Sequence, residues 1–229
     1  MCGRYVLKST LEELKKTYNA VPDGLYEFNA HYNVAPSLSM PVILQNEEKN
    51  RVISAYQWGL VPFWADTPKT GYSMINARAE SLQKKRSFSK PFASQRCIVP
   101  ASGFYEWKRS GSDKVPHYIF SPHEPLLHFA GLYEHWKSSS GEAVESFTII
   151  TTEANNTIRE LHDRMPAILL PEELDIWLDS ENSDKTLLQD LLRPSPDETL
   201  AFYRVGQEVN NARNTGAGLA EPYRDLFSG

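Results

Sequence analysis

The chain contains 229 residues, of which 41% are hydrophobic and 23% are charged, and its formal net charge at pH 7 is −5. This composition is typical of a globular protein and excludes a disordered or fibrous chain. No apolar run approaches the roughly 18 residues of a membrane span, and the first residues lack the apolar segment of a secretory signal, so we expect a cytoplasmic protein without a membrane partner.

Helix signals are short, and strand signals dominate the middle of the chain. Thr10 followed by Glu13 has the spacing of a capping box and predicts a helix that continues to about Tyr18. Apolar and aromatic runs predict strands over residues 96–99, 103–107, 117–120 and 147–151. Residues 103–120 are expected to form a hairpin whose loop spans residues 109–114.

The second half of the chain adds three short helices. One or two helical turns are expected over residues 155–161, and Pro171 with two following acids predicts the start of another helix. Asp184 is expected to cap a fourth helix that carries four leucines on one face. These leucines are Leu187, Leu188, Leu191 and Leu192.

The order of these elements favours the α+β class. Strands do not alternate with long helices, which disfavours a parallel doubly wound sheet. The sequence has no internal repeat and no linker long enough to separate two domains. We therefore expect a single domain over residues 1–229, with a curled, mainly antiparallel, barrel-like sheet as its core and short peripheral helices.

The cysteines and histidines indicate whether a disulfide or a metal site is expected. Cys2 and Cys97 form no CxxC pair, and the six histidines show no metal-ligand spacing. A disulfide scaffold and a structural zinc site are therefore disfavoured, and we expect a monomer in a reducing compartment with no metal and no other cofactor.

Cys2 is the first residue that suggests reactivity. A small residue after Met1 permits removal of the initiator methionine, which would leave a 1,2-aminothiol at the new N-terminus. Its amine has an ordinary pKa of about 7.7–8.0 and its thiol of about 8.5, so both groups are partly nucleophilic near neutral pH. An aldehyde would form an imine with the amine, and the thiol would close a thiazolidine ring. The alternative is that Cys2 is simply a small apolar residue.

Three further segments carry polar candidates. Asn76 and Arg78 would share one face of an extended segment, or the segment is a plain strand that runs into a solvated basic helix carrying Lys84, Lys85, Arg86 and Lys90. Glu106 lies between two aromatic residues, where burial would raise its pKa toward that of a general acid or base; otherwise it faces water from an edge strand. His162 is either a proton shuttle or a structural group, and Arg164 is suited to hold a phosphate.

Tryptophan and charge patterns point to nucleic acid less directly. Trp58 and Trp64 have the character of core residues, and one of them, which we assign as Trp64, is suited to stack on a base. Residues 1–115 carry a net charge of +6, whereas residues 116–229 carry −11. Either this asymmetry is chance clustering on a solvated surface, or the first half builds a basic face toward a polyanion.

Taken together, an ordered set of short motifs resembles the SRAP family, the SOS-response-associated peptidases or abasic-site processing proteins. No single motif is decisive, but the set is specific and spans residues 1 to about 215. The motifs are MCGRY (1–5), YNVAP (32–36), WGLVP (58–62), NARAE (76–80), RCIVP (96–100), GFYEW (103–107), HDRMP (162–166) and VNN (209–211).

The resemblance implies a function and a set of roles. Members of this family capture abasic sites in single-stranded DNA by forming a thiazolidine between the terminal cysteine and the ring-opened sugar, and the peptidase label is tied to removal of Met1. The implied roles are nucleophile for Cys2, sugar positioning for Asn76, acid/base catalysis for Glu106, sugar opening and crosslink reversal for His162, and phosphate contact for Arg4, Arg78 and Arg164.

Two other functions remain open from the sequence. An N-terminal-nucleophile hydrolase, such as a glutamine amidotransferase or a peptidase, would also use a cysteine exposed after Met1. A non-enzymatic single-strand DNA binder would bind without forming a covalent adduct. The first would release ammonia from glutamine, and the second would show only salt-sensitive binding.

Overall fold

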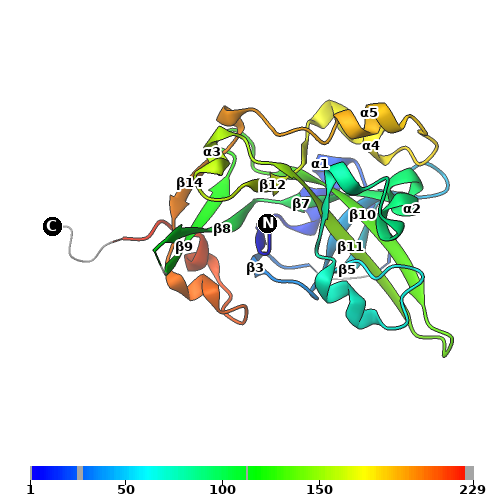
Figure 1. The fold of residues 1–229 in the computed structure, drawn as a ribbon, viewed down its shortest axis with the longest axis horizontal. Coiled ribbons are helices and arrows are strands. Elements are labelled where there is room, and N and C mark those ends of the chain that lie inside the picture. Colours follow the sequence, from blue (N-terminus) through cyan, green and yellow to red (C-terminus); the bar gives the residue numbers. More distant parts are fainter. Residues whose placement is uncertain (1, 25–27, 112, 225–229) are drawn as a thin grey trace.

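Two β-sheets that share one hydrophobic core organise the fold (Figure 1). The structure is a computed structural model, and it describes residues 2–24, 28–111 and 113–224. Most strand pairs are antiparallel, and the helices are short and lie around the sheets (Figure 1). The predicted α+β class with a curled, mainly antiparallel sheet is therefore confirmed.

The larger sheet closes into a five-stranded barrel. Neighbouring strands follow the order β11–β10–β7–β4–β5, and β11 then pairs with β5 in parallel, which joins the two ends. Strand β7 is buried along its whole length, as expected for a strand inside a closed sheet. The barrel strands are β4 (Ser39–Gln45), β5 (Arg51–Trp58), β7 (Arg96–Ala101), β10 (Leu127–Lys137) and β11 (Ala143–Glu153).

Four shorter strands extend the barrel. β2 and β6 pair in parallel with β5 and β11, while β12 and β13 pair antiparallel with β11 and β10. They are β2 (Val21–Pro22), β6 (Asn76–Arg78), β12 (Arg164–Pro166) and β13 (Ile168–Leu169).

The smaller sheet has the order β14–β9–β8–β1–β3 and lies beside the barrel (Figure 1). An aromatic chain links the two sheets, because the ring of Tyr5 lies 5.2 Å from that of Trp58, which in turn stacks on Phe147. The strands are β1 (Tyr5–Leu7), β3 (His31–Val34), β8 (Gly103–Ser110), β9 (Asp113–Phe120) and β14 (Ala201–Arg204).

The predicted hairpin over residues 103–120 is confirmed, but its predicted loop is too long. Arg109 pairs with Lys114 and Ser110 pairs with Asp113, so β8 and β9 continue almost to the tip. Side chains near this tip are exposed, so the apolar pattern that marks a strand ends before the backbone pairing does.

The helices follow the predicted signals closely. Thr10 accepts a hydrogen bond from the backbone of Glu13, and the Glu13 carboxylate accepts one from the backbone of Thr10, which completes the capping box of α1. Pro171 begins a 3-10 turn that leads into α4. The helices are α1 (Leu11–Tyr18), α2 (Arg86–Ser94), α3 (Asn156–Arg159), α4 (Leu174–Leu178) and α5 (Lys185–Asp190).

Three of the four leucines predicted on the apolar face of α5 and its end are buried, and one is not. Asp184 caps the helix as expected, and Leu188, Leu191 and Leu192 are buried, but Leu187 is 40% exposed. The helix ends after one and a half turns, so a face drawn for a longer helix does not apply. Among the described residues, no helix is long and apolar enough to cross a membrane.

Gly103 allows β8 to approach its neighbour β9 closely. A Cβ at this position would collide with the carbonyl oxygen of Ile119 and lie 2.6 Å from the ring of Tyr118. Both obstacles belong to the buried interior of the smaller sheet. Only glycine therefore fits at the start of β8.

We expect Gly103→Ala to lower the free energy of unfolding by about 1–3 kcal/mol, the usual cost of overpacking. Gly218→Ala is the matched control, because a Cβ there meets nothing within 4 Å, and its effect should stay within about 0.5 kcal/mol. Urea denaturation of both variants measures the difference. Equal stabilities would contradict the packing assigned to Gly103.

Candidate active site

The pairing of β1 with β8 brings the start of the chain to Glu106. Tyr5 lies opposite Phe104, and Val6 lies opposite Gly103, in an antiparallel register. The backbone N–H of Tyr105 also donates a hydrogen bond to the carbonyl of Arg4 at 3.0 Å. Continuing this register places Gly3 opposite Glu106, next to Cys2.

Cys2 is completely buried and lies just before β1 in the chain. Burial raises the pKa of its thiol well above the ordinary value, and the negative charge of Glu106 raises it further. The thiol lies 3.8 Å from the carbonyl oxygen of Arg4, toward which it donates. The site therefore holds Cys2 as a neutral thiol beside a carboxylate, and Met1 lies outside the described residues.

Asn76 holds the backbone of Cys2 from the barrel side. Its side-chain amide donates a hydrogen bond to the Cys2 carbonyl at 2.8 Å. Asn76 begins β6 and pairs with Ile149 of β11, so its position is set by the barrel. Its Oδ1 atom is buried and has no hydrogen-bond partner among the described residues.

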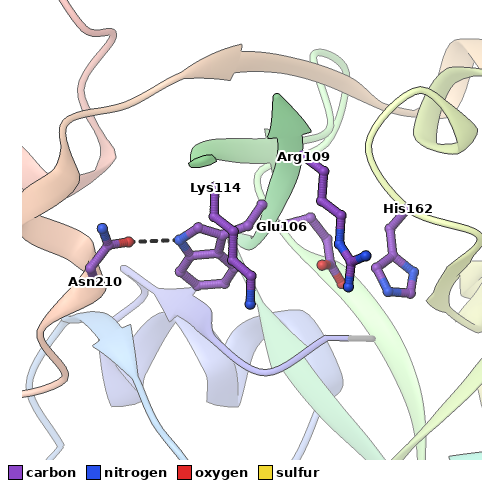
Figure 2. A pocket seen from close by; sticks show the side chains of 6 residues that line it. Glu106, Arg109, Lys114, His162 and Asn210 are labelled. Carbon is purple, nitrogen blue, oxygen red and sulfur yellow. Dashed lines mark hydrogen bonds between the residues drawn. The ribbon is translucent and has the colours of Figure 1, made fainter. Parts of the chain in front are cut away.

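Glu106 and His162 meet at a cavity of about 450 Å³ (Figure 2). Glu106 is 4% exposed, so the predicted desolvated position is confirmed and an edge position in water is excluded. Figure 2 shows its carboxylate and the imidazole of His162 directed toward the same space. The other lining residues are Trp107, Arg109, Lys114 and Asn210.

His162 has a partner for each of its protonation states. The backbone N–H of Arg164 donates to the Nδ1 atom of His162 at 2.9 Å, which suits the neutral ring protonated at Nε2. Asp163 Oδ1 lies 2.8 Å from the same Nδ1 atom and accepts a hydrogen bond when that nitrogen carries a proton. These two neighbours fix the orientation of the imidazole ring.

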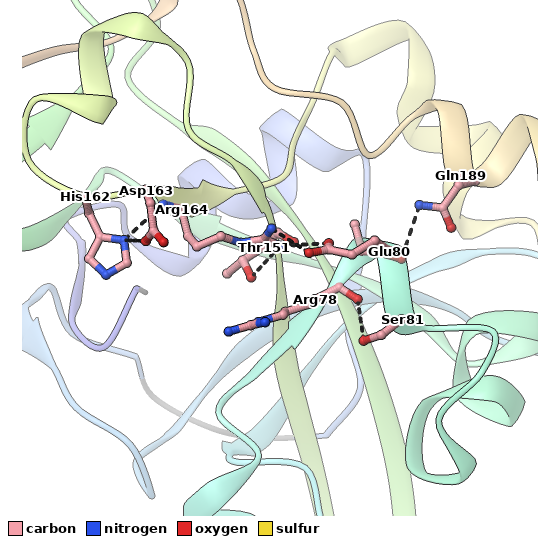
Figure 3. Close-up of polar contacts among 9 residues, drawn as sticks. Arg78, Glu80, Ser81, Thr151, His162, Asp163, Arg164 and Gln189 are labelled. Atoms are coloured by element: carbon pink, nitrogen blue, oxygen red, sulfur yellow. Dashed lines mark hydrogen bonds and ion pairs between the residues drawn. The ribbon is translucent and has the colours of Figure 1, made fainter.

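Arg78 and Arg164, both predicted to contact phosphates, differ in how far their guanidinium groups already bind other residues of the protein (Figure 3). Arg78 is exposed, and its guanidinium makes no hydrogen bond or ion pair with another described residue. Arg164 is buried and forms a bidentate pair with Glu80 at 2.7 and 2.9 Å, and it also donates to the carbonyl of Thr151. The terminal nitrogens and the charge of Arg164 are thus engaged within the protein, whereas its Nε atom has no hydrogen-bond partner among the described residues. The phosphate contact of Arg164 stays a prediction.

Arg4 also acts within the protein. Its guanidinium donates to Oδ1 of the buried Asn33 at 2.7 Å and to the carbonyl of Val209 at 3.0 Å. The amide of Asn33 donates in turn to the carbonyls of Asn211 and Asn214. Arg4 thus fastens the segment that carries Asn210 against β1, and most of its donors are unavailable to a phosphate.

The tryptophan prediction divides between the two residues. Trp58 is buried, and its indole donates to the carbonyl of Ile75 at 2.9 Å, so it belongs to the core. Trp64 is 37% exposed, and the guanidinium of Arg86 lies 5.2 Å from its ring centroid. Its predicted position in the core is wrong, while stacking on a base stays a prediction.

The sequence did not predict a role for several residues of the site. Glu80 and Asn33 lie inside two of the quoted motifs, but a motif does not tell which side chain pairs with which. The sequence predicts a loop at Arg109 and Lys114, but two cations close together at a hairpin tip also suit an anion-binding site. Among the described residues, no group of three or more His, Cys, Asp or Glu side chains is arranged to hold a metal ion.

Comparison with known proteins agrees with this geometry. A family model described as SOS response associated peptidase (SRAP) matches residues 1–212. The chain belongs to the SRAP family. Every residue described above in this site, except Asn214, lies within the matched range, so the site is built from the region that matches the family model.

Named relatives and a solved structure extend this result. The chain is 42% identical over 227 residues to the abasic site processing protein YoqW of Bacillus subtilis, covering 97% of this chain and 100% of that protein. It is 32% identical over 257 residues to the abasic site processing protein HMCES of Xenopus tropicalis, covering 93% and 76%. A crystal structure of a protein from Bacteroides thetaiotaomicron matches with a TM-score of 0.88 at 28% identity, covering 97% and 100%.

The pair between Glu80 and Arg164 makes a pH-dependent contribution to stability. Partial burial of Glu80 raises its pKa, but the hydrogen bonds of Arg164, a backbone hydrogen bond, the charge of Arg164 and the smaller effect of the Arg78 charge together leave the pKa below its ordinary value. Because the folded-state pKa is depressed, the pair stabilises the protein fully above the ordinary glutamate pKa of about 4.3. The contribution is lost as the pH falls through the lowered value.

We therefore expect Glu80→Gln to be less stable than the wild type at pH 7, with a difference that shrinks as the pH is lowered below about 4. Thermal melting across this pH range measures it. Arg164→Ala should also be destabilised, whereas Arg78→Ala should melt as the wild type does. A loss of stability in Arg78→Ala alone would reverse the assigned roles.

Proposed function

We propose that this protein captures abasic sites in single-stranded DNA through a covalent bond to Cys2, after Met1 has been removed. The observation that carries the proposal is the placement of Cys2: a buried thiol beside Glu106, with its backbone carbonyl held by Asn76. The names of the relatives support the same substrate, since they are called abasic site processing proteins.

The proposed reaction proceeds in two steps, imine formation and ring closure. The free amine of Cys2 attacks the aldehyde carbon of the ring-opened sugar, and loss of water gives an imine. The thiol sulfur then adds to the imine carbon, and its proton passes to the nitrogen, which closes a thiazolidine ring. No oxidant or reductant is required.

Each neighbouring side chain is suited to assist one of these reaction steps. Glu106 is positioned to accept the thiol proton and to return it to the nitrogen, since its charge already acts on the thiol. His162 lines the same cavity as Glu106 and is suited to move a proton during sugar opening and crosslink reversal. Asn76 fixes Cys2 and offers its Oδ1 atom to a sugar hydroxyl, while Arg78 stands exposed for a phosphate.

Two variants one residue apart test the order of the steps. In Cys2→Ala the amine remains, so an imine forms but no ring closes. We expect this variant to cleave the strand by β-elimination and to be trapped only by a reductant. A chain with one unremovable residue before Cys2 keeps the thiol but converts the amine to an amide, and we expect it to form neither adduct.

Intact-mass measurement after incubation with an oligonucleotide that carries one abasic site reads out both results. A stable adduct from the blocked chain would mean simple thiol addition and would overturn the aminothiol mechanism. Ammonia release from glutamine by the wild type, with no adduct, would identify an amidotransferase-like hydrolase. Binding without any adduct would leave a simple single-strand binder.

A separate prediction concerns the two acid/base candidates. Glu106→Gln keeps the shape of the side chain but cannot accept the thiol proton, so adduct formation should slow by about 100-fold or more, while strand affinity stays near that of the wild type. His162→Gln should chiefly slow sugar opening and crosslink reversal. Single-turnover rates in both directions measure this, and normal rates for both variants would make the two residues structural.

A further inference from the structure

A pair of cations lines the cavity that contains Glu106 and has no role in the chemistry proposed above. Arg109 of β8 and Lys114 of β9 lie directly opposite each other near the tip of the hairpin. Both line the cavity that contains Glu106 and His162 (Figure 2). Figure 2 shows the two long side chains extending from the hairpin toward this space.

The arrangement leaves positive charge available to a ligand. Like charges that lie directly opposite across two strands destabilise a hairpin, and neither side chain has a hydrogen bond or ion pair to another described residue. Residues 108–114 carry three cations and one anion, so the tip is net positive. The unfavourable pairing is relieved once an anion binds between the two side chains.

The cavity separates charge in a way that suits a nucleotide. Glu106 is buried, so its carboxylate repels a phosphate from the interior, whereas the exposed Arg109 and Lys114 attract one at the rim. A neutral sugar can enter while its phosphate stays outside. The wall beside the pair is fixed, because the indole of Trp107 donates to Oδ1 of Asn210 at 2.7 Å (Figure 2).

The two sheets place cations on opposite sides of the start of the chain. Arg78 comes from β6 of the barrel, where Asn76 binds the carbonyl of Cys2, whereas Arg109 and Lys114 come from the hairpin of the smaller sheet, whose strand β8 pairs with β1. A strand that crosses Cys2 from one sheet to the other meets Arg78 on one flank and the hairpin pair on the other.

We propose that Arg109 and Lys114 form a phosphate-binding subsite for the DNA strand on the hairpin side of the abasic nucleotide. This subsite rests on the proposed function, and it adds the path of the strand. Arg78 serves the opposite flank, so each side of the reacting sugar is held by a different sheet.

The test compares variants that each remove one positive charge. Arg109→Gln and Lys114→Gln remove the proposed contacts, and Lys108→Gln is the matched control, since Lys108 is exposed on the same strand but does not line the cavity. The probes are two oligonucleotides that extend from an abasic site only in the 5′ direction or only in the 3′ direction. Adduct formation is followed as a function of probe concentration and of salt.

We expect Arg109→Gln and Lys114→Gln to raise the half-saturating concentration by about fivefold for one probe only, with an unchanged maximum rate. The logarithmic salt slope for that probe should fall by about 0.7 for each variant, as for one lost single-strand phosphate contact. Arg78→Gln should show the same effects with the other probe. Lys108→Gln should match the wild type with both.

Results for the two hairpin variants that equal those for Lys108→Gln would overturn the subsite, as would equal losses with both probes. Binding of matching probes with a tetrahydrofuran residue, which mimics the abasic sugar but lacks an aldehyde, separates this failure from that of the proposed function. If the wild type forms no adduct but the hairpin variants still bind one tetrahydrofuran probe about fivefold more weakly, the covalent chemistry fails and the subsite stands.

Discussion

The short antiparallel pairing of β1 with β8 is the constraint on which the site depends. It brings the start of the chain to β8, where the charge of Glu106 acts on the Cys2 thiol. A shift of this register by one residue would turn each β1 side chain to the other face. The contact of Tyr5 with Trp58 opposes such a shift. Core packing therefore positions the Cys2 end of the chain.

The arginines show why charge alone does not identify a binding residue. Arg4, Arg78 and Arg164 look equivalent in the sequence, but Arg164 is matched by Glu80, 84 residues away, and Arg4 by the carbonyl of Val209, 205 residues away. Such long-range partners follow only from the tertiary fold. Arg4 and Arg164 bind other parts of the protein, whereas Arg78 is exposed.

Local signals predicted the elements well, because capping and strand alternation are written in neighbouring residues. The Thr10 capping box and the 103–120 hairpin illustrate this. Closure of the barrel by the parallel pairing of β11 with β5 has no such local signal. Likewise, flanking aromatic residues foretold the burial of Glu106, whereas the exposure of Trp64 depends on a loop whose path only the tertiary structure defines. The motif resemblance identified most of the candidate site, but it did not distinguish contact residues from supporting ones.

The environment of Cys2 also favours one order of events. Burial and the charge of Glu106 raise the pKa of the thiol, so little thiolate exists at neutral pH, while an ordinary α-amine with a pKa of about 7.7–8.0 is partly unprotonated. The amine is therefore the group suited to attack first. In the proposed mechanism, the carboxylate that suppresses thiolate formation then becomes the base that accepts the thiol proton once the imine has formed. Protonation of Glu106 in that proposed step would remove the repulsion that held the thiol inactive, so the same pair would first restrain thiol chemistry and then promote ring closure.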